Sequence, residues 1–188
     1  MSEKIVFFSS ALTRGGAERQ LVALAKELKK RRRKIVVVAY DRGVFDNELT
    51  AAGVEIYYAN RRGVFGILGF LFRAAKLLRS LKPTIVYSFL GTPNIYAVLF
   101  KPFLRGVKIV WGIRASNIDA KSYGIASRFA EYLETLFSRF PDLIVANSNA
   151  GRELCIKKGF PKDKIVVVEN GIDTERFNYD PKGAKRVR

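Results

Sequence analysis

The chain has 188 residues, 48% of them hydrophobic, so it is long and apolar enough to fold as one domain with a full core. It has no histidine and one cysteine, Cys155, which excludes histidine-based catalysis, an internal disulfide and a zinc site within the chain. Lys and Arg number 34 against 17 Asp and Glu, and the net charge of +17 predicts an anionic partner: a phosphorylated small molecule, an anionic membrane surface or nucleic acid.

Apolar runs rich in Val, Ile, Phe and Tyr recur at steady intervals and predict strands. Their residues are 4–10, 34–40, 54–59, 84–90, 107–112, 143–148 and 164–169. Helical patterns separate most of them, at 16–33, 64–81, 93–103, 124–140 and 149–158. Because the strand runs are nearly continuous, the strands are expected to be buried on both faces. The sequence therefore predicts an α/β fold, an open, mostly parallel, doubly wound Rossmann-like sheet of about seven strands with helices on both faces.

The first strand follows almost directly on Met1, so no secretory signal segment is predicted. The longest apolar stretch, residues 63–72, is too short to span a bilayer. With a single cysteine, these features predict a cytoplasmic protein.

Two adjacent glycines, Gly15 and Gly16, lie between the first predicted strand and the first predicted helix. Ligands of open α/β sheets bind at the carboxyl ends of the strands, and glycine lets the backbone approach a phosphate at a helix N-terminus. A tight turn capped by Thr13 or Ser10 explains the same residues. The loop matches neither G-x-G-x-x-G nor the P-loop, although Asp41, after the second strand, stands where a ribose-binding acid would.

Segment 61–82 combines basic and apolar side chains in a helical pattern. Its basic residues recur every three positions, and its apolar residues exceed what one buried stripe needs. This favours an amphipathic helix at a membrane interface. The candidates for facing the membrane are Phe65, Phe70, Arg73, Lys76 and Arg79. A helix that packs on the sheet with a solvated basic face explains the pattern equally. The basic run 29–34 is either a solvated helix end or a contact with a membrane or with nucleic acid.

Four segments resemble stretches of the family-4 glycosyltransferases, retaining enzymes with the two-domain GT-B fold. The segments are RGGAERQLVALAKEL (14–28), VYSFLGTPNIYAVL (86–99), IRASN (113–117) and VVVENGIDTERF (166–177). They follow the family's order, and the second and third are similar to a subgroup acting on lipid-linked or polysaccharide acceptors. The resemblance implies an N-terminal Rossmann-like, acceptor-binding domain at 1–173 and the start of an interdomain linker at 174–188.

In such enzymes the N-terminal domain binds the acceptor, the C-terminal domain holds a nucleotide-diphosphate sugar, and the active site is the cleft between them. The resemblance implies that Arg14, Gly15 and Gly16 face the donor diphosphate. It implies acceptor-binding roles for Ser88, Asn94, Arg114, Ser116 and Asn117. Each of three residues also has a purely structural interpretation. Arg14 is then an exposed loop arginine, Arg114 forms a surface ion pair, and Asn94 stabilises the start of a helix.

The resemblance implies hexosyl transfer with retention, in which the leaving phosphate accepts the proton. A side-chain base is therefore not required, and no catalytic residue is assigned. No bound metal or resident cofactor is expected in the chain. The chain departs from the family pattern at Ile113, where Glu is usual, and in having no histidine near the fifth strand. It also has no pair of glutamates eight residues apart, the motif of the family's donor-binding domain. We expect that domain to be supplied in cis or in trans, and these 188 residues alone to be inactive.

Two other functions stay open. One is a non-catalytic basic α/β module that docks to a partner protein or to the inner face of an anionic membrane. The other is a nucleotide-binding Rossmann protein of different chemistry. The sequence contains no RRM-type aromatic motif, so nucleic acid is not an expected partner.

Overall fold

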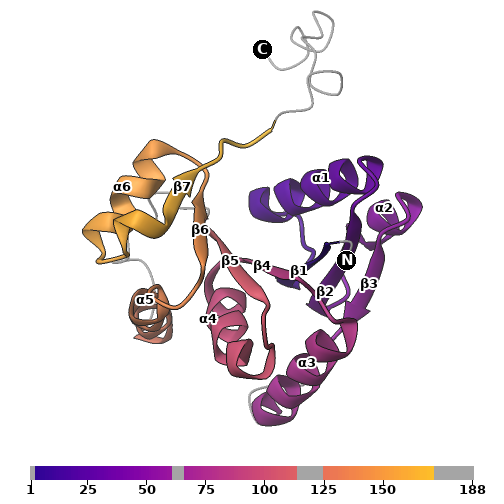
Figure 1. Ribbon diagram of the computed structural model, residues 1–188, viewed down its shortest axis with the longest axis horizontal. Helices are drawn as coiled ribbons and strands as arrows, with labels where there is room; N and C mark the ends of the chain where they lie inside the picture. Colours follow the sequence, from indigo (N-terminus) through magenta and orange to yellow (C-terminus); the bar gives the residue numbers. More distant parts are fainter. Residues whose placement is uncertain (1–2, 61–65, 114–124, 172–188) are drawn as a thin grey trace, which may run out of the picture.

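The computed structural model describes residues 3–60, 66–113 and 125–171. They form one sheet of seven parallel strands in the order β3-β2-β1-β4-β5-β6-β7 (Figure 1). The strands are β1 Lys4–Ala11, β2 Lys34–Asp41, β3 Glu55–Tyr58, β4 Ile85–Phe89, β5 Lys108–Ile113, β6 Leu143–Ala146 and β7 Ile165–Val167. The predicted fold class is confirmed. The central residues of β2, from Ile35 to Tyr40, are all buried, as its continuous apolar run requires.

The helices are α1 Gly16–Lys30, α2 Asp46–Ala51, α3 Ile67–Leu81, α4 Gly91–Phe100, α5 Ile125–Phe137 and α6 Asn149–Lys157. Short 3-10 turns lie at Lys101–Phe103 and Lys162–Lys164. The sequence predicted every helix except α2, which has six residues and one buried side chain, Leu49. So short a helix shows no measurable 3.6-residue period. Pro93 lies in the first turn of α4, where its missing N–H breaks no intrahelical bond.

The helices cover both faces of the sheet. On one face, α1 and α2 pack through Leu21, Ala25 and Leu49 against Phe7 and Val37. On the other face, the packing elements are α3, α4, α5 and α6 (Figure 1). The chain changes face between β3 and β4, and β4 then pairs with β1. This arrangement places a topological switch point between the carboxyl ends of β1 and β4.

The packing of α3 corrects one prediction. Phe70 was expected to face a membrane, but it is fully buried. Its ring meets the Tyr40 ring edge-on, with the centroids 4.7 Å apart. Phe70, Ala74 and Leu78 are four residues apart and form the stripe of α3 that faces the sheet. The helical period therefore assigns Phe70 to the core.

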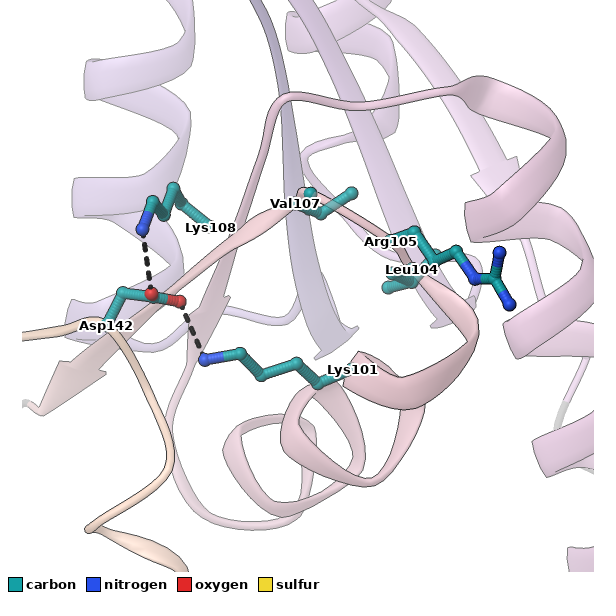
Figure 2. Close-up of a pocket in the computed structure, with 7 residues that line it drawn as sticks. Lys101, Leu104, Arg105, Val107, Lys108 and Asp142 are labelled. Carbon is teal, nitrogen blue, oxygen red and sulfur yellow. Dashed lines mark hydrogen bonds and ion pairs between the residues drawn. The ribbon is translucent and has the colours of Figure 1, made fainter.

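Asp142, just before β6, ties β6 to the amino end of β5. Its carboxylate accepts the backbone N–H of Ile109 at 2.9 Å and pairs with the ammonium groups of Lys101 and Lys108 at 2.9 and 3.1 Å (Figure 2). Together with the segment from Leu104 to Val107, these groups line a cavity of about 300 Å³. Partial burial of Asp142 opposes its ionisation, but the Ile109 N–H and the two lysines outweigh it and lower its pKa to about 2.

We predict that Asp142 makes the stability of the chain depend on pH in acid. The pKa of Asp142 in the folded chain is below that of an unfolded aspartate, so its contribution is complete above about pH 4 and disappears as the pH falls towards 2. Asp142→Asn should lower the free energy of unfolding near neutral pH by roughly 2 kcal/mol. Urea unfolding of both proteins at several pH values measures this difference.

The gap between wild type and Asp142→Asn should narrow as the pH is lowered from 5 towards 2. Asp163→Asn, in the exposed turn Lys162–Lys164, is the control and should change little. A gap that stays constant with pH would contradict the role of the Asp142 charge.

Candidate functional site

The candidate site lies at the carboxyl edge of the sheet. Two segments meet the switch point there, the β1–α1 loop around Gly15 and the β4–α4 turn at Leu90 and Gly91. Because β1 and β4 are parallel neighbours, with Phe8 opposite Ser88, the two connections leave the sheet at the same edge. The cavity beside Asp142 lies at the opposite edge and is not part of this site.

In the β1–α1 loop, Gly15 is the N-cap of α1 and Gly16 is its first residue. The structure therefore excludes Thr13 and Ser10 as the cap of this helix. Arg14 and Gly16 are exposed, and a Cβ added to Gly16 would meet no other atom within 4 Å. The three residues predicted to face a diphosphate thus lie together, at a helix N-terminus whose first N–H groups have no partner within the helix.

A carboxylate lies against this loop. The side chain of Glu18, in the first turn of α1, folds back so that a Cβ added to Gly15 would overlap it. A negative charge is stabilised there by the positive end of the helix dipole. The same field would stabilise a phosphate. The sequence did not single out Glu18, although an acid three residues after a helix cap is a common signal.

The loop between β2 and α2 supports the β1–α1 loop from the side. A Cβ added to Gly43 would overlap the carbonyl of Leu12 and lie 2.7 Å from its Cα. Asp46 fixes this loop by accepting the Gly43 N–H at 3.0 Å and the Tyr58 hydroxyl at 2.7 Å. Burial of the phenol and its bond to Asp46 raise the pKa of Tyr58 to about 12. Nothing in the local sequence marks Gly43, and only its close approach to Leu12 reveals its role.

Ser88 and Asn94 do not present their side chains to a ligand. Both are fully buried. The Ser88 hydroxyl donates to Asn94 Oδ1 at 2.7 Å, and Asn94 Nδ2 donates to Glu134 Oε1 at 2.8 Å. The structure thus contradicts direct acceptor contact by these two residues, because their polar atoms are used inside the protein. Glu134, on α5, completes this buried chain, and nothing in its local sequence marked it.

The remaining site predictions divide between described and undescribed segments. Phe65, Arg114, Ser116, Asn117 and the proposed linker 174–188 lie outside the described residues. Ser148 caps α6, its hydroxyl accepting the Gly151 N–H at 3.0 Å. In the described part of the chain, no three His, Cys, Asp or Glu side chains gather as metal ligands.

The segment after β7 returns to α1. The N–H of Val168 bonds to the carbonyl of Ala146 at 2.9 Å, and the Gln20 amide on α1 donates to the carbonyl of Gly171 at 3.0 Å. The chain therefore passes α1, the helix that begins at the glycine loop, before it reaches the undescribed residues (Figure 1).

This chain is similar in fold to several solved proteins. Anabaena HepE, solved in complex with UDP, has a TM-score of 0.78 at 19% identity over 98% of this chain and 49% of its own. A glycosyltransferase of Rickettsia africae has a TM-score of 0.70 at 19% identity over 100% of this chain and 49% of its own. MurG of Acinetobacter baumannii has a TM-score of 0.62 at 20% identity over 90% of this chain and 46% of its own.

The chain thus spans about half the length of these structures. No curated protein matches it by sequence. The family model described as Glycosyltransferase Family 4 matches residues 14–176, which run from the glycine loop to the segment beyond β7. The chain therefore belongs to Glycosyltransferase Family 4.

Proposed function

We propose that the chain is the acceptor-side half of a glycosyltransferase that moves a hexosyl group from a nucleotide sugar to a lipid-linked or polysaccharide acceptor with retention. The observation that supports this most directly is the glycine loop. In a chain of this family, Gly16 leaves open space at the N-terminus of a 15-residue helix, at the switch point where α/β proteins bind ligands.

The donor is a nucleoside diphosphate sugar, with UDP as the favoured nucleotide because HepE was solved with UDP. The diphosphate gains negative charge as the sugar leaves, and the N–H groups of the first turn of α1 would stabilise that charge. Arg14 is exposed beside them and would add a charge-assisted bond. The Glu18 carboxylate must swing away from Gly15 before the diphosphate enters.

A second domain holds the rest of the donor. The bond between Gln20 and Gly171 keeps the segment after β7 beside α1, so a domain following it would begin close to the glycine loop. The cleft between the two domains would then include this loop. Without that domain the loop offers one wall of a site, and the chain alone is expected to be inactive. Arg114, Ser116 and Asn117 remain the proposed acceptor contacts.

The acceptor is proposed to be brought by a membrane that the protein touches from the cytoplasmic side. The exposed side of α3 carries Leu68 and Phe72, which are 78% and 72% exposed, beside the exposed Arg73, Lys76 and Arg79. Apolar side chains flanked by cations are typical of helices that lie in an anionic interface. Among the described residues, none of the helices is long and apolar enough to cross a bilayer.

We predict that Gly16→Val weakens binding of the sugar donor without unfolding the chain. Its Cβ meets no atom within 4 Å, so the substitution blocks the approach of a ligand rather than the fold. In a protein that joins this chain to a family-4 donor-binding domain, KM for UDP-sugar should rise by about tenfold or more. Steady-state transfer assays measure it, with the thermal unfolding midpoint recorded alongside.

Gly69→Ala, a glycine in the first turn of α3 where only the flexible Arg73 side chain is near, is the matched control for the Gly16 variant. It should leave KM for the donor unchanged. If the joined wild-type protein neither binds UDP-sugars nor transfers sugar, the enzymatic proposal falls. A non-catalytic module remains if the chain still binds anionic vesicles and Gly16→Val leaves that binding intact.

Gly43→Ala should disturb the glycine loop from outside it. The new methyl group would overlap the backbone of Leu12, and backbone cannot rotate away as a side chain does. We expect a lower unfolding midpoint and an altered amide NMR shift for Gly15 and Gly16. Ala51→Gly, at an exposed position of α2, is the control and should leave the amide shifts of Gly15 and Gly16 unchanged.

The apolar residues of α3 should contribute to membrane binding. Replacing Leu68 and Phe72 together by Ser removes the free energy gained when these two side chains move from water into the membrane. Binding to phosphatidylglycerol vesicles should therefore weaken roughly tenfold or more. Vesicle sedimentation at fixed salt measures this. Val168→Ser, exposed at the far end of the sheet, is the control. Equal binding of the double variant and wild type would show that this face of α3 does not touch the membrane.

A further inference from the structure

The turn between β4 and α4 has a backbone that its sequence does not favour. Leu90 has φ 62° and ψ 141°, a conformation that glycine adopts readily and other residues rarely do, and Gly91 follows with φ 44°. Strained residues of this kind persist only where neighbouring groups hold them, and they cluster at functional sites. This turn lies at the switch point, beside the glycine loop. The groups that hold the turn would therefore also fix one edge of the proposed cleft.

Leu90 is the N-cap of α4 and has no side chain that could bond the free N–H groups of that helix. A carboxylate from α5 lies at this end of the helix. Glu134 accepts the side-chain amide of Asn94 at 2.8 Å, and the nearby backbone N–H of Gly91 favours its ionised form and so lowers its pKa. Its negative charge therefore lies at the positive end of the α4 dipole. A neighbouring helix thus performs the capping that the turn itself cannot.

The contact continues into the sheet. Asn94 Oδ1 accepts the Ser88 hydroxyl at 2.7 Å, and that hydroxyl also lies 3.3 Å from the carbonyl of Val110 on β5. On the other side of the turn, the Leu90 N–H bonds to the carbonyl of Gly112 at 3.1 Å. Strand β4, the first turn of α4 and helix α5 are therefore joined by one run of hydrogen bonds that ends on Glu134.

The charges around Glu134 come from α5 and α6. Burial raises its pKa, the Asn94 bond and the charge of Lys158 lower it, and the neighbouring Glu131 raises it. Lys158 forms an ion pair with Glu131, so one cation faces two carboxylates. Glu131 is one turn from Glu134 on the same helix but no contact of the described residues connects it to the β4–α4 turn. It is therefore the matched control for Glu134.

We propose that Glu134 is a positioning residue for sugar transfer: it holds the strained Leu90–Gly91 turn and so fixes the edge of the cleft that meets the acceptor. The inference rests on the proposed function, because it assumes that the cleft is where transfer occurs. Glu134 touches neither substrate. It acts through the backbone of Gly91 and through Asn94.

The first experiment needs no activity. Amide hydrogen exchange at Gly91 is compared in the 188-residue chain for wild type, Glu134→Gln and Glu131→Gln. Loss of the carboxylate should speed exchange at Gly91 by about tenfold or more, while Glu131→Gln leaves it unchanged. Should Glu134→Gln fail to fold, Glu134→Asp keeps the charge but is too short to reach, and the same acceleration is expected. Unchanged exchange at Gly91 in a folded Glu134 variant would overturn the proposal.

The second experiment measures transfer by the joined two-domain protein. Glu134→Gln should lower kcat/KM for the acceptor by about tenfold while KM for the UDP-sugar stays within about twofold of wild type. A purely structural role predicts lower stability with neither constant changed selectively. Equal loss for donor and acceptor, or no loss, would overturn the proposal while the proposed function stands. An inactive wild-type protein would instead defeat the proposed function, and Gly91 exchange would still decide whether Glu134 holds the turn.

A rescue separates the backbone effect from the charge itself. Glycine adopts the Leu90 conformation without strain, so Leu90→Gly in the Glu134→Gln background should recover a large part of the lost kcat/KM. Leu90→Gly alone is measured beside the double variant as the reference for that recovery. No recovery in the double variant would show that Glu134 acts otherwise than through this turn, and the positioning role would be wrong.

Discussion

The pairing of β1 with β4 is the constraint on which the rest of the architecture depends. These two strands are adjacent in the sheet although two strands and three helices separate them in sequence. To bring β4 beside β1, the chain must cross from the face covered by α1 and α2 to the face covered by α3. The connections that follow β1 and β4 therefore diverge to opposite faces, and α/β proteins bind ligands between such connections.

Both connections are shaped by groups that are distant in sequence. The glycine loop is bounded by Gly43, whose Cα approaches the backbone of Leu12 so closely that no side chain fits. The β4–α4 turn is bounded by Glu134, from a helix that begins after β5. In both cases a loop at the edge of the sheet owes its conformation to a neighbouring element rather than to its own residues. This explains why a leucine can occupy a conformation suited to glycine.

Whether a feature is shaped by its own residues or by distant ones decides whether the sequence could predict it. Seven strands and five helices follow from local periodicity, because burial on one or two faces leaves a repeating pattern in the chain. The glycine loop was also found locally, since paired glycines before a helix are a local signal.

Phe70 was placed wrongly because its apolar character fits both a core and an interface, and only its spacing with Ala74 and Leu78 distinguishes them. Ser88 and Asn94 lie at the carboxyl edge of the sheet, as predicted, but they are buried and not exposed to a ligand. Glu134 could not be found at all, since its partners lie 40 or more residues away.

The position of Glu18 explains how the glycine loop can be stable without a bound anion. A helix N-terminus that binds a diphosphate has unpaired N–H groups and a positive field, which cost free energy in the absence of an anion. The Glu18 carboxylate lies beside Gly15 and reduces this cost. In the proposed function, a diphosphate would have to displace this intramolecular anion, so the loop alone would bind it weakly. Contacts from a second domain would supply the remaining free energy, and donor binding would be coupled to the meeting of the two domains.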